Sequence, residues 1–204
     1  MTMRETIIEE NVSNHWNVRD DLKGKSLEEL KAMQNASSLP FAVCAVNITG
    51  DLNLGIMMRT ACVAGAERFI IYGKHGYDRR TTVGAHNYID IVKAGSIDRG
   101  GTLEVDWSRF HDTLRNLDYY PVYLETNCQW IYEFDPFPDM RDYGLKPCLV
   151  FGNEGIGLPG AITCGARHMY SIPQRGVLRS LNVCAAASIA IEYVSHKLVG
   201  IKYV

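Results

Sequence analysis

The chain has 204 residues, 47% of them hydrophobic, which suits one globular domain with a core of ordinary size. Its formal net charge of -2 gives no overall positive field, so any contact with nucleic acid must come from a local basic patch. The first residues are too charged for a secretory signal, and no apolar run is long enough to span a membrane. We therefore expect a soluble, cytoplasmic protein.

The cysteines indicate buried, reduced thiols rather than disulfides or a metal site. No two of them form a C-x-x-C pair, and most lie within apolar runs. The histidines add no metal-ligand spacing, so we expect no bound metal. The six positions are Cys44, Cys62, Cys128, Cys148, Cys164 and Cys184.

Residues 1–39 are predicted to form an N-terminal helical extension, and residues 40–204 a single globular domain. The segment S-L-E-E from Ser26 has the pattern of a capping box, which predicts a short helix. From Phe41 the pattern changes to a continuous apolar run, which is typical of a strand covered on both faces.

Strands and helices alternate along the rest of the chain, which predicts an α/β fold with a mainly parallel sheet flanked by helices. The expected strands are 41–48, 68–72, 88–93, 121–126, 148–151 and 169–172. The expected helices are 56–64, 107–117, one that starts within 158–164, and an Ala-rich last helix with Ser180 as its N-cap. Residues 49–55 are predicted to be a loop and residues 127–146 an irregular connection.

Basic side chains are concentrated between the second and third expected strands, at Lys74, His75, Arg79 and Arg80. Such a cluster is either a solvated loop or a local patch that contacts phosphates, and the sequence favours neither.

Three separate loops after strands carry polar residues. The first holds Asn53, Gly55 and Arg59, the second Gly152, Asn153, Glu154 and Gly157, and the third Arg179, Ser180 and Asn182. Loops at the carboxyl ends of parallel strands form the ligand crevice of an open α/β sheet, so together they predict a site. Each residue also has a structural explanation: Asn53 and Ser180 as helix caps, and Glu154 as an acid at a helix N-terminus.

The glycine loop G-N-E-G-I-G at residues 152–157 does not match known nucleotide-binding patterns. Its glycine order differs from G-x-G-x-x-G, and no acidic residue follows at the required distance. The sequence also contains no P-loop lysine motif and no G-x-S-x-G elbow.

The motifs resemble those of a known family. N-L-G-I-M-M-R-T-A (53–61), L-V-F-G-N-E-G-I-G-L-P (149–159) and I-P-Q-R-G-V-L-R-S-L-N-V (172–183) are similar, in this order, to the three motifs of SpoU/TrmH-type RNA ribose 2′-O-methyltransferases of the SPOUT superfamily. The third motif is most similar to the tRNA guanosine 2′-O-methyltransferase branch. The resemblance implies a C-terminal trefoil knot, S-adenosylmethionine bound within it, an RNA substrate, with tRNA favoured over rRNA, and a homodimer.

The resemblance also implies roles for individual residues. The catalytic positions would be Asn53, Arg59, Glu154, Ser180 and Asn182. The cofactor positions would be Gly152, Ile172 and Leu181, with Glu125 as a further candidate. RNA contacts would come from Lys74, His75, Arg79, Arg80, Arg175 and Arg179.

Transfer of a methyl group from a sulfonium requires mainly an in-line nucleophile at about 3–3.5 Å and a pocket that excludes water. The matching arginine, Arg59, is either the base for the ribose hydroxyl or a clamp for phosphate and developing alkoxide charge; a guanidinium is almost always protonated. Two other functions remain open: an RNA-binding protein that has lost catalysis, and a nucleotide-cofactor oxidoreductase that uses the glycine loop.

Overall fold

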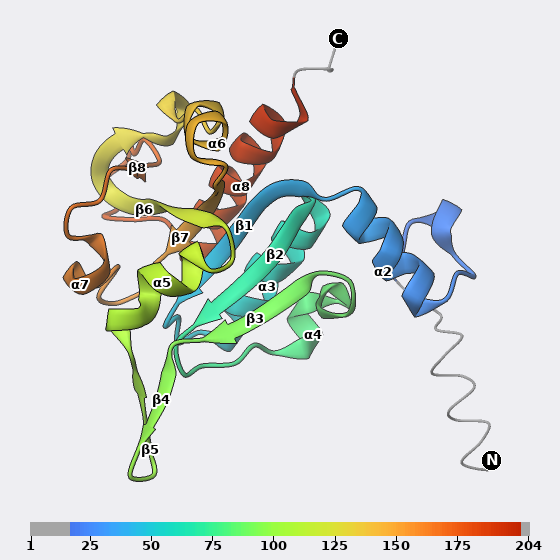
Figure 1. The fold of residues 1–204 in the computed structure, drawn as a ribbon, viewed down its shortest axis with the longest axis horizontal. Coiled ribbons are helices and arrows are strands. Elements are labelled where there is room, and N and C mark those ends of the chain that lie inside the picture. The colour runs from blue at the N-terminus through green and yellow to red at the C-terminus, as the bar shows by residue number, and fades with distance from the viewer. Residues whose placement is uncertain (1–16, 201–204) are drawn as a thin grey trace.

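The computed structural model describes residues 17–200. Its centre is a six-stranded sheet in the order β3-β2-β1-β7-β6-β8, and every neighbouring pair of strands is parallel (Figure 1). The strands are β1 (Leu39–Val46), β2 (Ala66–Tyr72), β3 (Asp90–Ala94), β6 (Tyr119–Trp130), β7 (Lys146–Phe151) and β8 (Met169–Ser171). The predicted α/β fold with a mainly parallel sheet is therefore confirmed.

Eleven helical segments, six of them a single short turn of three or four residues, are described. The longer ones are α2 (Leu27–Ala36), α3 (Asp51–Val63), α5 (Phe110–Arg115), α6 (Phe137–Tyr143) and α8 (Val183–Val199). The short ones are η1 (Asp20–Leu22), α4 (Arg79–Thr82), η2 (Ala85–Asn87), η3 (Trp107–Arg109), η4 (Ile131–Glu133) and α7 (Gly160–Thr163). No helix among residues 17–200 is long and apolar enough to cross a membrane.

Both faces of the sheet are buried, which explains the continuous apolar runs in the sequence. Phe41, Val43 and Ala45 of β1 lie in one hydrophobic cluster, with residues of α3 and α8. Ala42 and Cys44, which alternate with them, lie in the other cluster with Phe110 of α5. Within the expected helix 107–117, the buried side chains Phe110 and Leu114 both lie in this second cluster.

The N-terminal capping box is confirmed. The Ser26 hydroxyl accepts a hydrogen bond from the Glu29 amide, and the Glu29 carboxylate accepts one from the Ser26 amide. This reciprocal pair starts α2, the one α-helix described before β1.

The prediction that residues 49–55 form a loop is wrong, because α3 begins at Asp51 and has Gly50 as its N-cap. Gly55 therefore lies inside the helix. A Cβ at Gly55 would overlap Thr81 Oγ1 and would lie 2.8 Å from the Asp78 carbonyl oxygen. The glycine allows α4 to pack closely on α3, and this tertiary requirement outweighs its poor helix propensity.

The prediction of an irregular 127–146 segment is also wrong. β6 continues to Trp130 through an irregularity between Leu124 and Gln129, and η4 and α6 follow. A hairpin formed by β4 (Ser96–Arg99) and β5 (Thr102–Val105), which projects from the body of the molecule, was not predicted, although the Gly-Gly pair at residues 100–101 is a hairpin signal (Figure 1). Its turn consists of Gly100 and Gly101, both with positive φ.

Ser180 does not cap the last helix. The N-cap of α8 is Asn182, whose side-chain oxygen accepts a hydrogen bond of 2.8 Å from the Cys184 amide. Asn and Ser are both good N-caps, so the composition of the segment could not decide between them.

Candidate functional site

The second and third predicted loops meet at the carboxyl ends of the central strands, around a cavity of about 510 Å³. The middle of β6 and the segments following β7 and β8 contribute to its wall, together with the first residues of α8. The lining residues are Leu124, Glu125, Thr126, Phe151, Gly152, Asn153, Glu154, Gly155, Ile156, Gly157, Ile172, Gln174, Arg179, Ser180, Leu181, Asn182, Val183 and Ala186. This is the crevice in which open α/β sheets bind ligands.

The Glu154 carboxylate connects the loop after β7 to the start of α3. Its Oε1 accepts hydrogen bonds from the Gly50 amide at 3.1 Å and from the Asn53 side chain at 2.8 Å. Its Oε2 accepts from the amide and the hydroxyl of Thr49, both at 3.1 Å. Burial alone would raise the pKa of Glu154, but these hydrogen bonds outweigh it and hold the pKa below its ordinary value. Glu154 is therefore an ionised carboxylate at a helix N-terminus at neutral pH.

Asn53 extends this connection to the third loop. Its side-chain oxygen accepts hydrogen bonds from the Asn182 side chain at 3.4 Å and from the Cys184 thiol at 3.1 Å. Burial, together with the nearby charge of Glu154, raises the pKa of Cys184, so the thiol keeps its proton and remains a donor. With an acceptor on one side and donors on the other, the orientation of the Asn53 amide is fixed.

The glycine loop is shaped by backbone contacts. Asn153 and Gly157 exchange two backbone hydrogen bonds of 3.1 and 2.9 Å. A Cβ at Gly152 would lie 2.5 Å from the Leu158 amide nitrogen, so no larger residue fits there without a shift. The Glu125 carboxylate accepts a hydrogen bond of 3.1 Å from the Leu158 amide, and the Asn153 side chain donates one of 2.9 Å to the Asn47 carbonyl.

The structure brings most of the predicted site residues together. Gly152, Ile172, Leu181 and Glu125, predicted for the cofactor, all line the cavity. Of the residues predicted to be catalytic, Glu154, Ser180 and Asn182 line it, and Asn53 is hydrogen-bonded to two of these three. The Ser180 side chain makes no hydrogen bond to another residue in the described part of the chain, because Asn182 takes the capping role.

Arg59 lies elsewhere. It is exposed on α3, six positions after Asn53, and is not among the residues that line the cavity of its own chain. Exposed apolar side chains accompany it on the same helix: Leu52, Ile56 and Val63, of which Val63 is 80% exposed.

The basic residues fall into two groups. Arg179 lines the cavity, and Arg175 is exposed in the same loop. Lys74, Arg79 and Arg80 are exposed and His75 is half-buried, in the segment between β2 and the end of α4. Arg80 already pairs with Asp78 at 2.5 Å, so part of its charge is neutralised within this segment.

Thr49, Gly50 and Cys184, which complete the site, were not predicted, and Asn153 was named only as a polar residue of the second loop. Thr49 and Gly50 supply three of the four donors to Glu154, Asn153 ties the glycine loop to β1, and Cys184 orients Asn53. The polar residues Thr49 and Asn153 lie inside or beside the motifs already identified. The contact of Cys184 with Asn53 could not be inferred, since an apolar helix face gives no sign of a thiol donor.

The fold and this cavity together define an α/β protein with a candidate ligand site at the carboxyl edge of a parallel sheet. Residues 40–192 match the SpoU rRNA Methylase family. The chain therefore belongs to the SpoU family of RNA methylases, and the resemblance of the three motifs is confirmed.

Individual relatives agree with this membership. The chain is 25% identical over 172 residues to YacO of Bacillus subtilis, a protein assigned to the TrmH family of tRNA/rRNA methyltransferases. The match covers 82% of this chain but only 63% of that relative, so the chain spans less than two thirds of its length.

Solved structures share the fold. An RNA 2′-O ribose methyltransferase superposes with a TM-score of 0.63 at 21% identity, over 80% of this chain and 57% of that one. The SpoU methyltransferase AviRb of Streptomyces viridochromogenes, solved in complex with AdoMet, superposes with a TM-score of 0.59 at 21% identity, over 82% and 62% of the two chains.

Proposed function

We propose that this protein transfers a methyl group from S-adenosylmethionine to a ribose 2′-hydroxyl of RNA, with tRNA as the substrate class and the cytoplasm as the place of action. The observation that carries the proposal is the hydrogen-bond network from Glu154 through Asn53 to Asn182, which joins all three motifs beside one cavity. The family membership and the activities named for the structural neighbours support it.

The cavity fits S-adenosylmethionine in size and in character. Its volume of about 510 Å³ lies within the range of roughly 300–1,000 Å³ that is usual for small-ligand pockets. Gly152 allows the backbone at Gly157 and Leu158 to pack against it and so shapes the cavity wall, and Ile172 and Leu181 provide apolar surface. The N-terminus of α8, at Asn182 and Val183, faces the cavity and favours a negatively charged group.

When bound, the cofactor supplies an electrophilic methyl carbon on a sulfonium. The chain has to hold a ribose hydroxyl in line with that carbon and exclude water. Glu154 acts as a positioning residue: its low pKa and its four donors make it a poor base, but they fix Asn53. Ser180 and Arg179, on the cavity wall, are the groups that we assign to the ribose and its phosphate.

We assign Arg59 to phosphate binding and to stabilisation of the developing alkoxide, because a guanidinium stays protonated at neutral pH and is a poor base. Since Arg59 lies outside the cavity of its own chain, this role requires a second copy. The exposed apolar side chains Leu52, Ile56 and Val63 on the same helix are the surface that we propose for the homodimer.

We further propose that the C-terminal segment forms the trefoil knot that the motif resemblance implies, that residues 40–204 are the methyltransferase domain, and that residues 1–39 are a helical extension. An extension of this kind can select among RNAs without changing the chemistry.

Methyl transfer to total tRNA and to rRNA, with labelled S-adenosylmethionine, tests the function. We expect label in tRNA that is resistant to alkaline cleavage at the 3′ side of the modified nucleotide, as ribose 2′-O-methylation requires. Label on a base, or no transfer while S-adenosylhomocysteine raises the melting temperature, would contradict the proposed reaction. Light scattering at micromolar concentration tests the dimer.

A further inference from the structure

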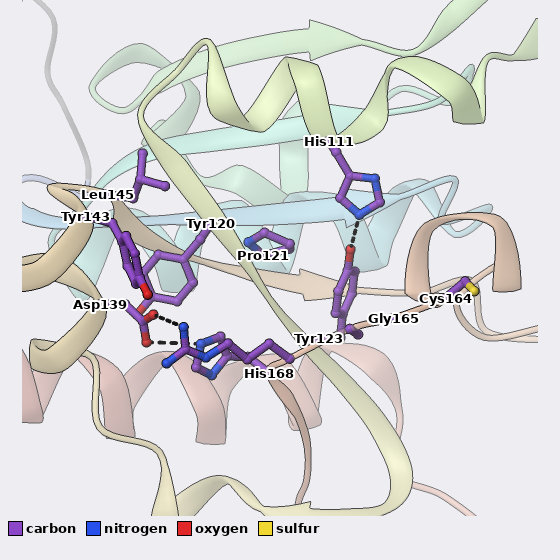
Figure 2. Close-up of a pocket in the computed structure, with 12 residues that line it drawn as sticks. His111, Tyr120, Pro121, Tyr123, Asp139, Tyr143, Leu145, Cys164, Gly165 and His168 are labelled. Atoms are coloured by element: carbon purple, nitrogen blue, oxygen red, sulfur yellow. Dashed lines mark hydrogen bonds and ion pairs between the residues drawn. The ribbon is translucent and has the colours of Figure 1, made fainter.

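A second cavity, of about 280 Å³, lies at the edge of the sheet and shares no lining residue with the first (Figure 2). β8 pairs with β6 only from Tyr123 onward, so the first residues of β6 have no strand on that side. Pro121, which lacks an N–H, occupies this open edge. The wall is formed by His111, Tyr120, Pro121, Tyr123, Asp139, Tyr143, Leu145, Cys164, Gly165, Ala166, Arg167 and His168.

The wall of this cavity includes a buried carboxylate. The Asp139 side chain is 8% exposed and pairs with Arg167 at 3.1 Å, while the Arg167 side chain is 64% exposed. An ionised carboxylate offers about four acceptor positions and no donor. Arg167 and His168 are the ion-pair partners of Asp139 in the described structure, so acceptor positions remain for a ligand.

His168 adds a second unsatisfied group. Its Nε2 is buried and lies 3.0 Å from Asp139 Oδ2, but without the alignment of a hydrogen bond. Burial lowers the pKa of His168, against the opposite pull of Asp139. If His168 is neutral, Arg167 is the one cationic partner of Asp139, and it lies on the exposed side of the carboxylate. The buried Nε2 of His168 then has no hydrogen-bond partner and could bond to a ligand.

Aromatic side chains form a further part of the wall. The rings of Tyr120 and His168 lie 5.2 Å apart, and Arg167 lies 5.9 Å from the ring centre of Tyr143, which is 63% exposed at the rim. Flat aromatic surfaces beside a single carboxylate suit a planar heterocycle with donors along one edge. The volume, slightly below the usual range for whole small ligands, suits one ring system rather than a nucleotide.

We propose that this cavity binds a guanine base of the RNA, with the base edge on the Asp139 carboxylate. Guanine alone among the four bases presents two adjacent donors, N1–H and the 2-amino group, on its pairing edge. Adenine and cytosine place an acceptor nitrogen beside their amino group, and uracil flanks its N–H with two carbonyls, so each sets an acceptor against the carboxylate.

The proposal rests on the proposed function for its RNA substrate, but it concerns a different nucleotide from the one that is methylated. The two cavities have separate walls, so the guanine would fix the register of the RNA while another nucleotide enters the cofactor cavity. Unpaired bases held in this way are the usual source of sequence selection in RNA recognition.

Cys164 provides a direct readout. Of the six cysteines, all within residues 17–200, it alone is exposed, and it lines this cavity. Guanosine 5′-monophosphate should slow the alkylation of Cys164 by a maleimide. Inosine 5′-monophosphate, which lacks the 2-amino group, should protect roughly tenfold less effectively, and adenosine 5′-monophosphate should not protect. Alkylation of the half-buried Cys128 is the internal control.

Two variants separate a binding site from a structural ion pair. Asp139→Asn should remove the preference for guanosine over inosine. Tyr143→Ala should weaken protection at least threefold without unfolding the chain, whereas Phe137→Ala, on the same helix but outside the wall, should not. A short guanosine-containing oligoribonucleotide should protect better than the free nucleotide.

Equal protection by guanosine and adenosine monophosphates, or none at millimolar concentration, would overturn the site. Better protection by the free nucleotide than by the oligonucleotide would overturn its assignment to RNA. The assay needs no methyl transfer, so it can fail independently of the proposed function. Protection without methyl transfer would contradict the proposed reaction alone, and methyl transfer without protection would contradict the guanine site alone.

Discussion

Replacement of Glu154 by Gln changes one oxygen of the carboxylate into an amino group and tests the network at its centre. All four partners of the carboxylate donate to it: the amide and hydroxyl of Thr49, the Gly50 amide and the Asn53 side chain. The amide of glutamine keeps only one of the two acceptor oxygens, and its NH2 group cannot accept a hydrogen bond. A flip of the Asn53 amide would break the hydrogen bonds that Cys184 and Asn182 donate to its oxygen, so Asn53 continues to present its NH2 group to residue 154.

The favoured arrangement therefore keeps the bonds to Gly50 and Asn53 and loses the bond from the Thr49 amide. One lost hydrogen bond to a charged acceptor costs about 1.5–3 kcal/mol, but Glu154 is exposed and water can reach this amide. We expect a loss of about 1 kcal/mol in the free energy of unfolding at pH 7. For a chain of this length that corresponds to a fall of about 2–4 °C in Tm.

The pH dependence is the sharper measurement. The folded-state pKa of Glu154 lies below its ordinary value of 4.5, so the carboxylate contributes stability that is present above that value. This contribution is lost as the pH falls through the folded-state pKa. The difference in Tm between wild type and Glu154→Gln should thus be constant from pH 6 to 8 and shrink below about 4.5.

Thermal unfolding across this pH range, followed by circular dichroism, measures the difference. Glu192→Gln, an exposed carboxylate on α8, is the control and should show no such pattern. Equal Tm values at pH 7, or a difference that grows as the pH falls, would refute the account of the network.

Three further predictions concern other parts of the molecule. Arg59→Ala should abolish methylation and leave the affinity for S-adenosylhomocysteine within about twofold by calorimetry, because Arg59 does not line the cavity; loss of cofactor binding would show that α3 is misplaced. In filter binding, the double variant Arg79→Ala, Arg80→Ala should flatten the dependence of log affinity for tRNA on log salt by about 0.7–0.9 per lost contact. Most of this change should come from Arg79, because Arg80 pairs with Asp78. An unchanged slope would identify the segment as a solvated loop. Gly55→Ala should lower the free energy of unfolding by about 1–3 kcal/mol in urea, because the new methyl group overlaps Thr81 Oγ1. Thr81→Ala in the same chain should restore part of the lost stability. Additive effects of the two substitutions would contradict the packing of α4 on α3.

The sequence predicted the parts of the fold that local patterns determine. Continuous apolar runs identified β1 and β7, because both faces of each strand are covered. The capping box at Ser26 located α2, since its two hydrogen bonds join residues three positions apart. The three polar segments were expected to meet because carboxyl ends of parallel strands share one edge: the second and third line the cavity, and the first, at the start of α3, reaches them through the hydrogen bonds of Asn53.

The errors came from requirements that lie outside the local sequence. The glycine-containing start of α3 was taken for a loop, because the close approach of α4 to Gly55 involves residues more than twenty positions later. The N-cap of α8 was placed at Ser180 because the requirement for Asn182 depends on its tie to Asn53 on another element. The cavity at Asp139 was not foreseen, because it is formed by an edge that β8 leaves open.

The hydrogen bonds between Thr49 and Glu154 affect when the site can form during synthesis and folding of the chain. The two residues are 105 positions apart, and β7, which delivers Glu154, inserts beside β1 in the middle of the sheet. At a synthesis rate of about 5–20 residues per second, Thr49 waits roughly 5–20 s on the ribosome before its partner exists. Pairings of such high contact order also fold slowly. During synthesis the edge of β1 that will receive β7 is uncovered, so this edge is where we expect a chaperone, or a misfolded neighbour, to bind first.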